Sequence, residues 1–136
     1  MKPDRGGDAR RAAKAGAVYF LVVFACGFAL GALRTIVITP RIGDTAAVAV
    51  ESPVMLAISW YAAGAFVRRF AVRRWPAAAL MGALAFALLM GAEFILGLAL
   101  GVSLRESVMR WLTPGGALGL AGQALFALFP IFRRRS

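Results

Sequence analysis

The chain contains no histidine and one cysteine, and only six of its 136 residues are acidic. Without histidine, imidazole-based catalytic triads, histidine-ligated haem and the usual zinc sites are excluded. With Cys26 alone, neither an intramolecular disulfide nor a cysteine-based metal site can form. We therefore expect a protein that is not an enzyme and that binds neither a metal nor a cofactor.

Charge is scarce as well, because 16% of the residues are charged and 61% are hydrophobic. An ordinary soluble domain has about 25% charged and roughly 45–50% apolar residues. Together with a mean hydropathy of +0.77, this composition indicates an integral membrane protein whose partner is the lipid bilayer. The formal net charge is +10, but the basic residues form short blocks between apolar runs rather than one polar face, so nucleic acid is not an expected partner.

Four apolar runs are each close to the ~20 residues that cross the hydrocarbon layer as a helix. They lie at about 15–38, 46–67, 76–101 and 115–132. Continuous apolar runs rich in Ala, Leu and Gly lack the alternation of barrel strands, so the fold class is all-α. We expect a polytopic single membrane domain over 1–136, with a basic tail at 1–14.

The positions of the basic residues predict the orientation of this bundle. Twelve of the 16 lie in the N-terminal tail, in the connection between the second and third runs, or at the C-terminus. The other two connections hold only Arg41, Arg105 and Arg110. By the positive-inside rule, both termini are expected in the cytoplasm, which for a bacterial chain means a multi-pass protein of the inner membrane. Tyr19 and Trp75 near the cytoplasmic boundary suit an interfacial aromatic belt.

Two connections carry signals for helix boundaries. Asp44 is placed to cap the second span, and Pro53 predicts either a kink or a fresh start with Ser52 as the N-cap. Between the third and fourth spans, Ser103 and Glu106 have the spacing of a capping box. This spacing predicts a short interfacial helix at that point.

Ionisable residues within the apolar runs are the main candidates for a site, because a charge in a span usually faces a partner or water. At 1.5 Å per residue, Arg34 and Glu93 each lie about 26 Å from the cytoplasmic ends of their spans, and Glu51 about 8 Å from the other boundary. All three fall in the extracytoplasmic half. We predict an intramembrane polar cluster in which Arg34 pairs with Glu93, Glu51 or both, with Gln123 deeper and Arg41 and Asp44 above it.

Glycine spacing gives the expected inward faces of the helices. Small residues three or four apart let helices approach closely. The predicted packing positions are Gly27, Gly31, Gly97, Gly101, Gly116 and Gly119, and Gly82 lies on the same stripe of the third span as Glu93, Gly97 and Gly101. They place Arg34, Glu93 and Gln123 on the faces that point into the bundle.

Several stretches carry a resemblance: 39–43 (TPRIG), 50–56 (VESPVML), Ser59-Trp60 and 68–70 (RRF). With them the chain resembles uncharacterised small bacterial four-span membrane proteins, a resemblance that implies the fold and no function. Small multidrug transporters have a similar size and span number, but they require an acidic residue in the first span. This chain has Arg34 there, so we do not place it with them.

Two functions of different classes remain open. The first is a non-catalytic accessory or scaffold protein, in which the polar cluster is a structural ion pair. The second is a small oligomeric transporter or channel in which Glu93 and Glu51 exchange protons or cations. A homo-oligomer or a larger membrane complex is compatible with either.

Overall fold

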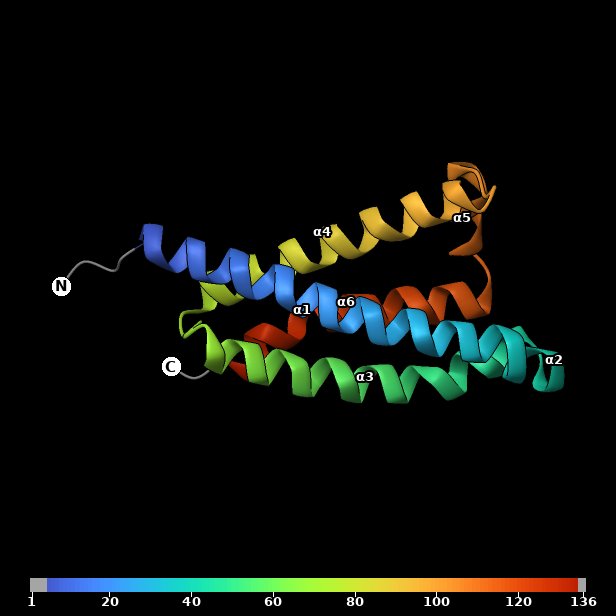
Figure 1. The fold of residues 1–136 in the computed structure, drawn as a ribbon, viewed down its shortest axis with the longest axis horizontal. Coiled ribbons are helices and arrows are strands. Elements are labelled where there is room, and N and C mark those ends of the chain that lie inside the picture. The colour runs from blue at the N-terminus through green and yellow to red at the C-terminus, as the bar shows by residue number, and fades with distance from the viewer. Residues whose placement is uncertain (1–4, 135–136) are drawn as a thin grey trace.

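The computed structural model describes residues 5–134, and these form helices joined by short turns, with no strand in that range (Figure 1). Within it, the side chain of Asp44 also lies outside the described part. The elements are α1 (Arg5–Leu33), a π-helical segment η1 (Arg34–Ile38), α2 (Thr39–Ile42), α3 (Asp44–Arg69), α4 (Trp75–Ala99), α5 (Leu104–Arg110) and α6 (Pro114–Arg133).

Four helical stretches are long and apolar enough to cross a membrane: Gly6–Ile42, Thr45–Arg69, Trp75–Ala99 and Gly116–Arg133. The predicted all-α class and four spans agree with this. The first helix differs from the prediction, because it begins at Arg5 and takes residues 5–14 of the basic tail with it. That segment is rich in alanine, which favours continued helix over an extended tail.

The helices form two antiparallel hairpins, α1 with α3 and α4 with α6 (Figure 1). Across the hairpins, α1 contacts α4 and α6 contacts α3. The start of α1, the end of α6 and the turn between α3 and α4 lie together, and we name this the terminal end. We name the opposite end, with α2 and α5, the distal end.

The packed core occupies the half of the bundle near the terminal end. Its buried members come from all four long helices and from the α3–α4 turn: Ala12, Ala15, Tyr19, Val23, Ala63, Val67, Val72, Ala77, Ala78, Met81, Ala85, Leu89 and Phe126. The α1 members recur every three or four residues, as one helix face requires. Towards the distal end α4 diverges from α1 (Figure 1), so the two hairpins are held together mainly at the terminal half.

Two glycines permit close helix crossings in this core. A Cβ at Gly16 would lie 2.8 Å from the backbone oxygen of Met81 in α4. A Cβ at Gly82 would overlap the backbone oxygen of Ala127 in α6. These contacts leave no space for a side chain, so α4 approaches α1 and α6 closely only because these residues are glycine.

Tyr19 supplies the one side-chain hydrogen bond described between α1 and α6. Its hydroxyl donates to the backbone oxygen of Phe126 at 2.7 Å, and the two rings stack with centroids 4.3 Å apart. Pro130 lies four residues after Phe126 and has no N–H, so this oxygen lacks its ordinary helical donor. Tyr19 is fully buried, and its predicted place in an interfacial belt is therefore wrong. The Phe126 oxygen, which has no helical donor, accepts the hydrogen bond of the Tyr19 hydroxyl in the core.

The turns after α3 and α4 have the same backbone form. After α3, Ala71 has φ 54° and the Val72 N–H bonds to the oxygen of Val67 at 2.9 Å. After α4, Gly101 has φ 87° and the Val102 N–H bonds to the oxygen of Gly97 at 2.7 Å. Both are Schellman motifs, which end a helix with one left-handed residue.

The second span begins differently from the sequence-based expectation. Gly43, with φ 87°, precedes the first helical residue, so glycine and not Asp44 occupies the capping position. Helix α3 then continues through Pro53 without a new start. Ser52, expected as an N-cap, instead donates its hydroxyl to the oxygen of Val48 at 2.7 Å, inside the same helix. The fresh-start alternative is therefore wrong, because tertiary packing of a long helix outweighs one missing hydrogen bond.

The short helix predicted between the third and fourth spans is present as α5. The Ser103 hydroxyl accepts a hydrogen bond from the Glu106 N–H at 3.1 Å, as in a capping box. The start of α6 repeats the device, since the Thr113 hydroxyl accepts from the Gly116 N–H at 3.1 Å.

Candidate functional site

An ion pair joins α3 to the π-helical segment that follows α1. Arg34 is the first residue of η1, and its Nε lies 2.5 Å from Oε2 of Glu51. Both side chains are mostly removed from the surface, with exposures of 25% and 17%. A charge pair at this depth holds the two helices of the first hairpin together where no packed core does so.

The backbone at Arg34 is unusual, and Pro40 explains it. The Thr39 N–H bonds to the oxygen of Arg34, five residues earlier. A proline ring collides with the carbonyl four residues before it, here that of Ile36, and a wider turn relieves such a collision. The π-helical segment therefore lies directly before the proline and sets the direction of the Arg34 side chain.

A second polar pair joins α4 to α6 in the other hairpin. The Gln123 amide nitrogen lies 2.7 Å from each carboxylate oxygen of Glu93. Glu93 follows Gly82 by eleven residues, which is three helical turns and so the face that meets α6. Gly82 lets α4 and α6 approach closely near the terminal end. Farther along, the longer side chains of Glu93 and Gln123 connect the same two helices. The Gln123 amide oxygen is buried and has no hydrogen-bond partner within residues 5–134.

The four predicted polar residues are thus arranged as two pairs. Arg34 binds Glu51, one of the two carboxylates proposed for it, and Glu93 binds Gln123. A direct pair between Arg34 and Glu93 is not described, and among the described side chains the predicted residues form one pair in each hairpin. The expected contribution of the Asp44 side chain lies outside the described residues.

Glu93 differs from Glu51 in its exposure. Its side chain is exposed although α4 is one of the helices apolar enough to span a membrane. Leu89, one turn earlier, is still part of the packed core. Glu93 therefore lies just beyond the last core member of α4, towards the distal end of that helix.

The predicted glycine positions mostly have other roles. Gly27 does face another helix, since an added Cβ would lie 3.3 Å from the Met55 side chain of α3. An added Cβ at Gly31 would meet the nearby side chain of Arg34, and one at Gly97 would meet those of Val102 and Ser107. Gly101 and Gly119 have no atom within 4 Å of an added Cβ, so neither packs against a helix of this chain.

Gly116 is close to backbone, but in a turn rather than in a helix crossing. An added Cβ would overlap the oxygen of Arg110 in α5. The stripe prediction is correct for Gly82, which meets α6, and wrong for Gly101 and Gly119, because glycine spacing shows which residues share a face and not which face has a neighbour. Gly16, at the other close crossing, lies outside the predicted stripes.

Sequence reasoning also missed a contact of Arg133, which was counted only as an orientation signal. Its guanidinium carbon lies 4.8 Å from the centre of the Trp60 ring, a cation–π contact. The same guanidinium occupies the space that a Cβ at Gly64 would need. The cation ties the end of α6 to α3. A glycine one turn after a tryptophan is compatible with such a contact but does not predict it.

The basic blocks meet at the terminal end in three dimensions. Asp8 accepts from Arg11 within α1 and lies 4.0 Å from Arg74, which precedes α4. The tail and the α3–α4 connection are therefore adjacent in the fold. Lys2 and Arg135, which belong to the same blocks, lie outside the described residues.

Comparison with known proteins adds no assignment. No protein-family model, no curated protein and no solved structure matches the chain. The geometry of the chain is therefore the basis for its proposed function.

Proposed function

We propose that this chain is a non-catalytic accessory or scaffold protein of the bacterial inner membrane, with both termini in the cytoplasm and α5 lying at the extracytoplasmic interface. The observation that carries the proposal is the exposed side chain of Glu93, which lies in a helix apolar enough to span a membrane. A charge facing lipid is costly, so such residues generally meet protein or water.

The form of the bundle supports a role in association. The terminal half is a packed body, whereas α4 diverges from α1 in the distal half (Figure 1). Gln123 donates to Glu93 but leaves its own amide oxygen without a partner among the described residues. A second copy, or another membrane protein that donates hydrogen bonds to the exposed Glu93 side chain, would satisfy this carboxylate.

The test compares the two glutamates of the spans. Tagged protein is purified from native membranes in mild detergent and analysed by mass spectrometry and size. We expect Glu93→Leu to lose an associated copy or subunit that the original chain retains. The matched control Glu51→Leu removes the same carboxylate from the Arg34 pair and should lower stability while keeping the association. Retention of the associated protein by Glu93→Leu would contradict the proposal.

The alternative is a small oligomeric transporter or channel that uses Glu93 and Glu51 for proton or cation exchange. The exposed Glu93 side chain favours it, together with a Gln123 amide oxygen that has no partner within residues 5–134. The packed core of the terminal half argues against a continuous path in this conformation, because its buried members are almost all apolar. Proton-coupled flux in proteoliposomes that Glu93→Gln abolishes without unfolding the protein would replace the scaffold proposal with this one.

A further inference from the structure

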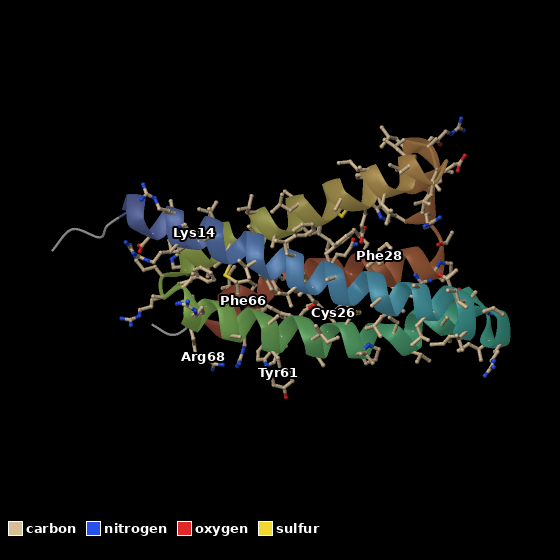
Figure 2. All side chains as sticks on the ribbon, in the orientation of Figure 1. Lys14, Cys26, Phe28, Tyr61, Phe66 and Arg68 are labelled. Carbon is tan, nitrogen blue, oxygen red and sulfur yellow. The ribbon has the colours of Figure 1, made fainter. Side chains whose placement is uncertain are left out.

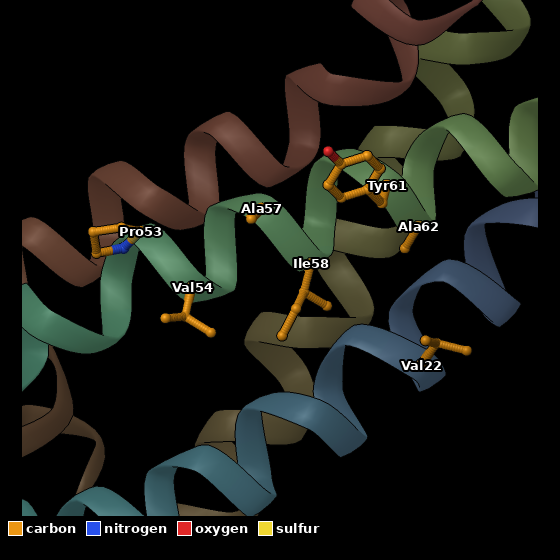
Figure 3. A pocket seen from close by; sticks show the side chains of 7 residues that line it. All are labelled: Val22, Pro53, Val54, Ala57, Ile58, Tyr61 and Ala62. Carbon is orange, nitrogen blue, oxygen red and sulfur yellow. The ribbon is translucent and has the colours of Figure 1, made fainter.

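A shallow apolar groove lies between α1 and α3 of the first hairpin (Figure 3). Val22 of α1 forms one side, and α3 contributes residues from Pro53 to Ala62. Its volume is about 660 Å³. The groove exists because Ala57 and Ala62 are small, while Tyr61 stands out beside them with 71% of its surface exposed.

The apolar groove leads towards a free cation at the terminal end. Arg68 follows Tyr61 by seven residues and Ala57 by eleven, so the three share one face of α3. Figure 2 shows Tyr61 and Arg68 projecting from the same outward side of this helix. Ala65, which is small and exposed, lies between them and leaves the path open.

Arg68 differs from its neighbour in what it contacts. The guanidinium of Arg69 lies 6.0 Å from the centre of the Phe70 ring. Arg68 is exposed and has no ion pair or ring contact within residues 5–134. Its charge is therefore available to an anion at the membrane surface, where each basic residue contributes about 1 kcal/mol of attraction to anionic lipid.

The length of this stripe indicates what covers it. From Arg68 to Pro53 is fifteen residues, or about 22 Å along a helix. One leaflet with its headgroups is half of a bilayer that is roughly 40–45 Å thick. The apolar part of the stripe suits an acyl chain of one-leaflet length, and the cation at its end suits the phosphate of the same lipid, whereas an apolar helix from another chain would leave Arg68 without an anion.

We infer that this stripe binds one anionic phospholipid, with its phosphate at Arg68 and an acyl chain in the groove beside Tyr61 and Ala57. The site holds the first hairpin in register with the leaflet at the terminal end. It does not depend on the association proposed for Glu93, which lies in the other hairpin.

The test measures lipid retention by the full chain in native mass spectrometry. Phosphatidylglycerol is the anionic probe and phosphatidylethanolamine the zwitterionic one. We expect the original chain to retain one phosphatidylglycerol in preference to phosphatidylethanolamine. Arg68→Gln should weaken phosphatidylglycerol retention roughly fivefold, the factor that corresponds to about 1 kcal/mol, and remove the preference. Arg73→Gln removes an equal charge from the α3–α4 turn and should leave both unchanged.

Filling the groove tests the acyl chain separately. Ala57→Phe should reduce retention of both lipids, and Ala65→Phe, on the exposed part of the stripe, provides a second variant if the first does not fold. Equal effects of Arg68→Gln and Arg73→Gln would overturn the site in favour of general positive charge. Unchanged retention in both filled variants would overturn the groove. A dimer of the original chain that dissociates on Ala57→Phe would assign the groove to a second copy instead.

Discussion

At the scale of single residues, the Tyr19 hydroxyl has a role that its ring alone cannot fill. It donates to the Phe126 oxygen that Pro130 leaves without a helical donor. Tyr19→Phe keeps the stacked ring but leaves a buried carbonyl unpaired, so we expect a loss of about 1 kcal/mol, within the range for hydrogen bonds in membrane bundles. Thermal unfolding in detergent measures this loss. Tyr61→Phe, which removes an exposed hydroxyl, should change stability by less than about 0.5 kcal/mol.

The same site allows a stricter test by a double-mutant cycle. Pro130→Ala restores an N–H that can bond to the Phe126 oxygen within α6. In that background Tyr19→Phe should cost less than it does in the original chain. Additive losses would show that the hydroxyl does not compensate for the proline.

A second residue-scale prediction concerns the partner of Arg34. The structure pairs it with Glu51 and gives Glu93 to Gln123. Removing one member of a charge pair leaves the other uncompensated, so the Arg34→Gln and Glu51→Gln losses should couple by more than about 0.5 kcal/mol. Arg34→Gln combined with Glu93→Gln should be additive within about the same amount. The opposite pattern of couplings would restore the single cluster predicted from the sequence.

The sequence predicts how deep a side chain lies along its span better than it predicts which side chain of another helix it contacts. Span depth placed Arg34, Glu51 and Glu93 in one half of the bundle, and the structure agrees with that division by setting all three beyond the packed core. Depth contains no information about which helices are neighbours. The choice between Glu51 and Glu93 therefore needed the helix arrangement, as did the burial of Tyr19.

At the scale of the elements, exchanging alanine and glycine in the two Schellman motifs is expected to change stability in opposite directions. Ala71 holds φ 54° with a Cβ, whereas Gly101 holds φ 87° without one. The left-handed conformation costs an L residue roughly 1–2 kcal/mol. Ala71→Gly should therefore stabilise the chain by about 1 kcal/mol and Gly101→Ala should destabilise it by a similar amount, as read from unfolding midpoints. Stability changes of the same sign in both variants would contradict the assignment of the motifs.

The crossing of α4 and α6 gives a second element-scale prediction. Gly82→Ala places a methyl group against the Ala127 carbonyl, and overpacking of this kind costs about 1–3 kcal/mol. Gly91 lies in the same helix with no atom within 4 Å of an added Cβ. Gly91→Ala is thus the matched control, expected to be neutral or stabilising because alanine favours helix. Equal losses in both variants would mean that Gly82 does not set this contact.

The presence of each helix was the most predictable property of the molecule. The contacts that each helix makes were less predictable. Hydropathy found all four long helices, and the Ser103 and Glu106 spacing found α5. The expected restart at Pro53 failed because an isolated proline signal does not include the packing of the whole helix. The predicted helix packing at Gly101 and Gly119 is wrong for a related reason, since Gly101 ends a helix and Gly119 faces no helix among the described residues.

At the scale of the whole molecule, the fold separates charge along its long axis. The described basic residues of the tail, of the α3–α4 connection and of the last turn of α6 lie at the terminal end, as Lys14 and Arg68 illustrate (Figure 2). The distal connections carry Arg41, Arg105 and Arg110 beside acidic residues such as Glu106. A strongly basic end and a nearly balanced end form the asymmetry on which the positive-inside rule operates.

This asymmetry predicts orientation, which labelling can measure directly. In a Cys26→Ser background, Met109→Cys in α5 and Ala71→Cys in the α3–α4 turn each provide one exposed thiol without changing any charge. An impermeant thiol reagent should label Met109→Cys on intact cells and Ala71→Cys only after the membrane is opened. The reverse pattern would invert the proposed topology and move the Arg68 stripe to the other leaflet. Because the lipid site is defined by its distance from the terminal end, the Arg68 retention result would hold in either orientation, and the labelling result decides which leaflet supplies the lipid.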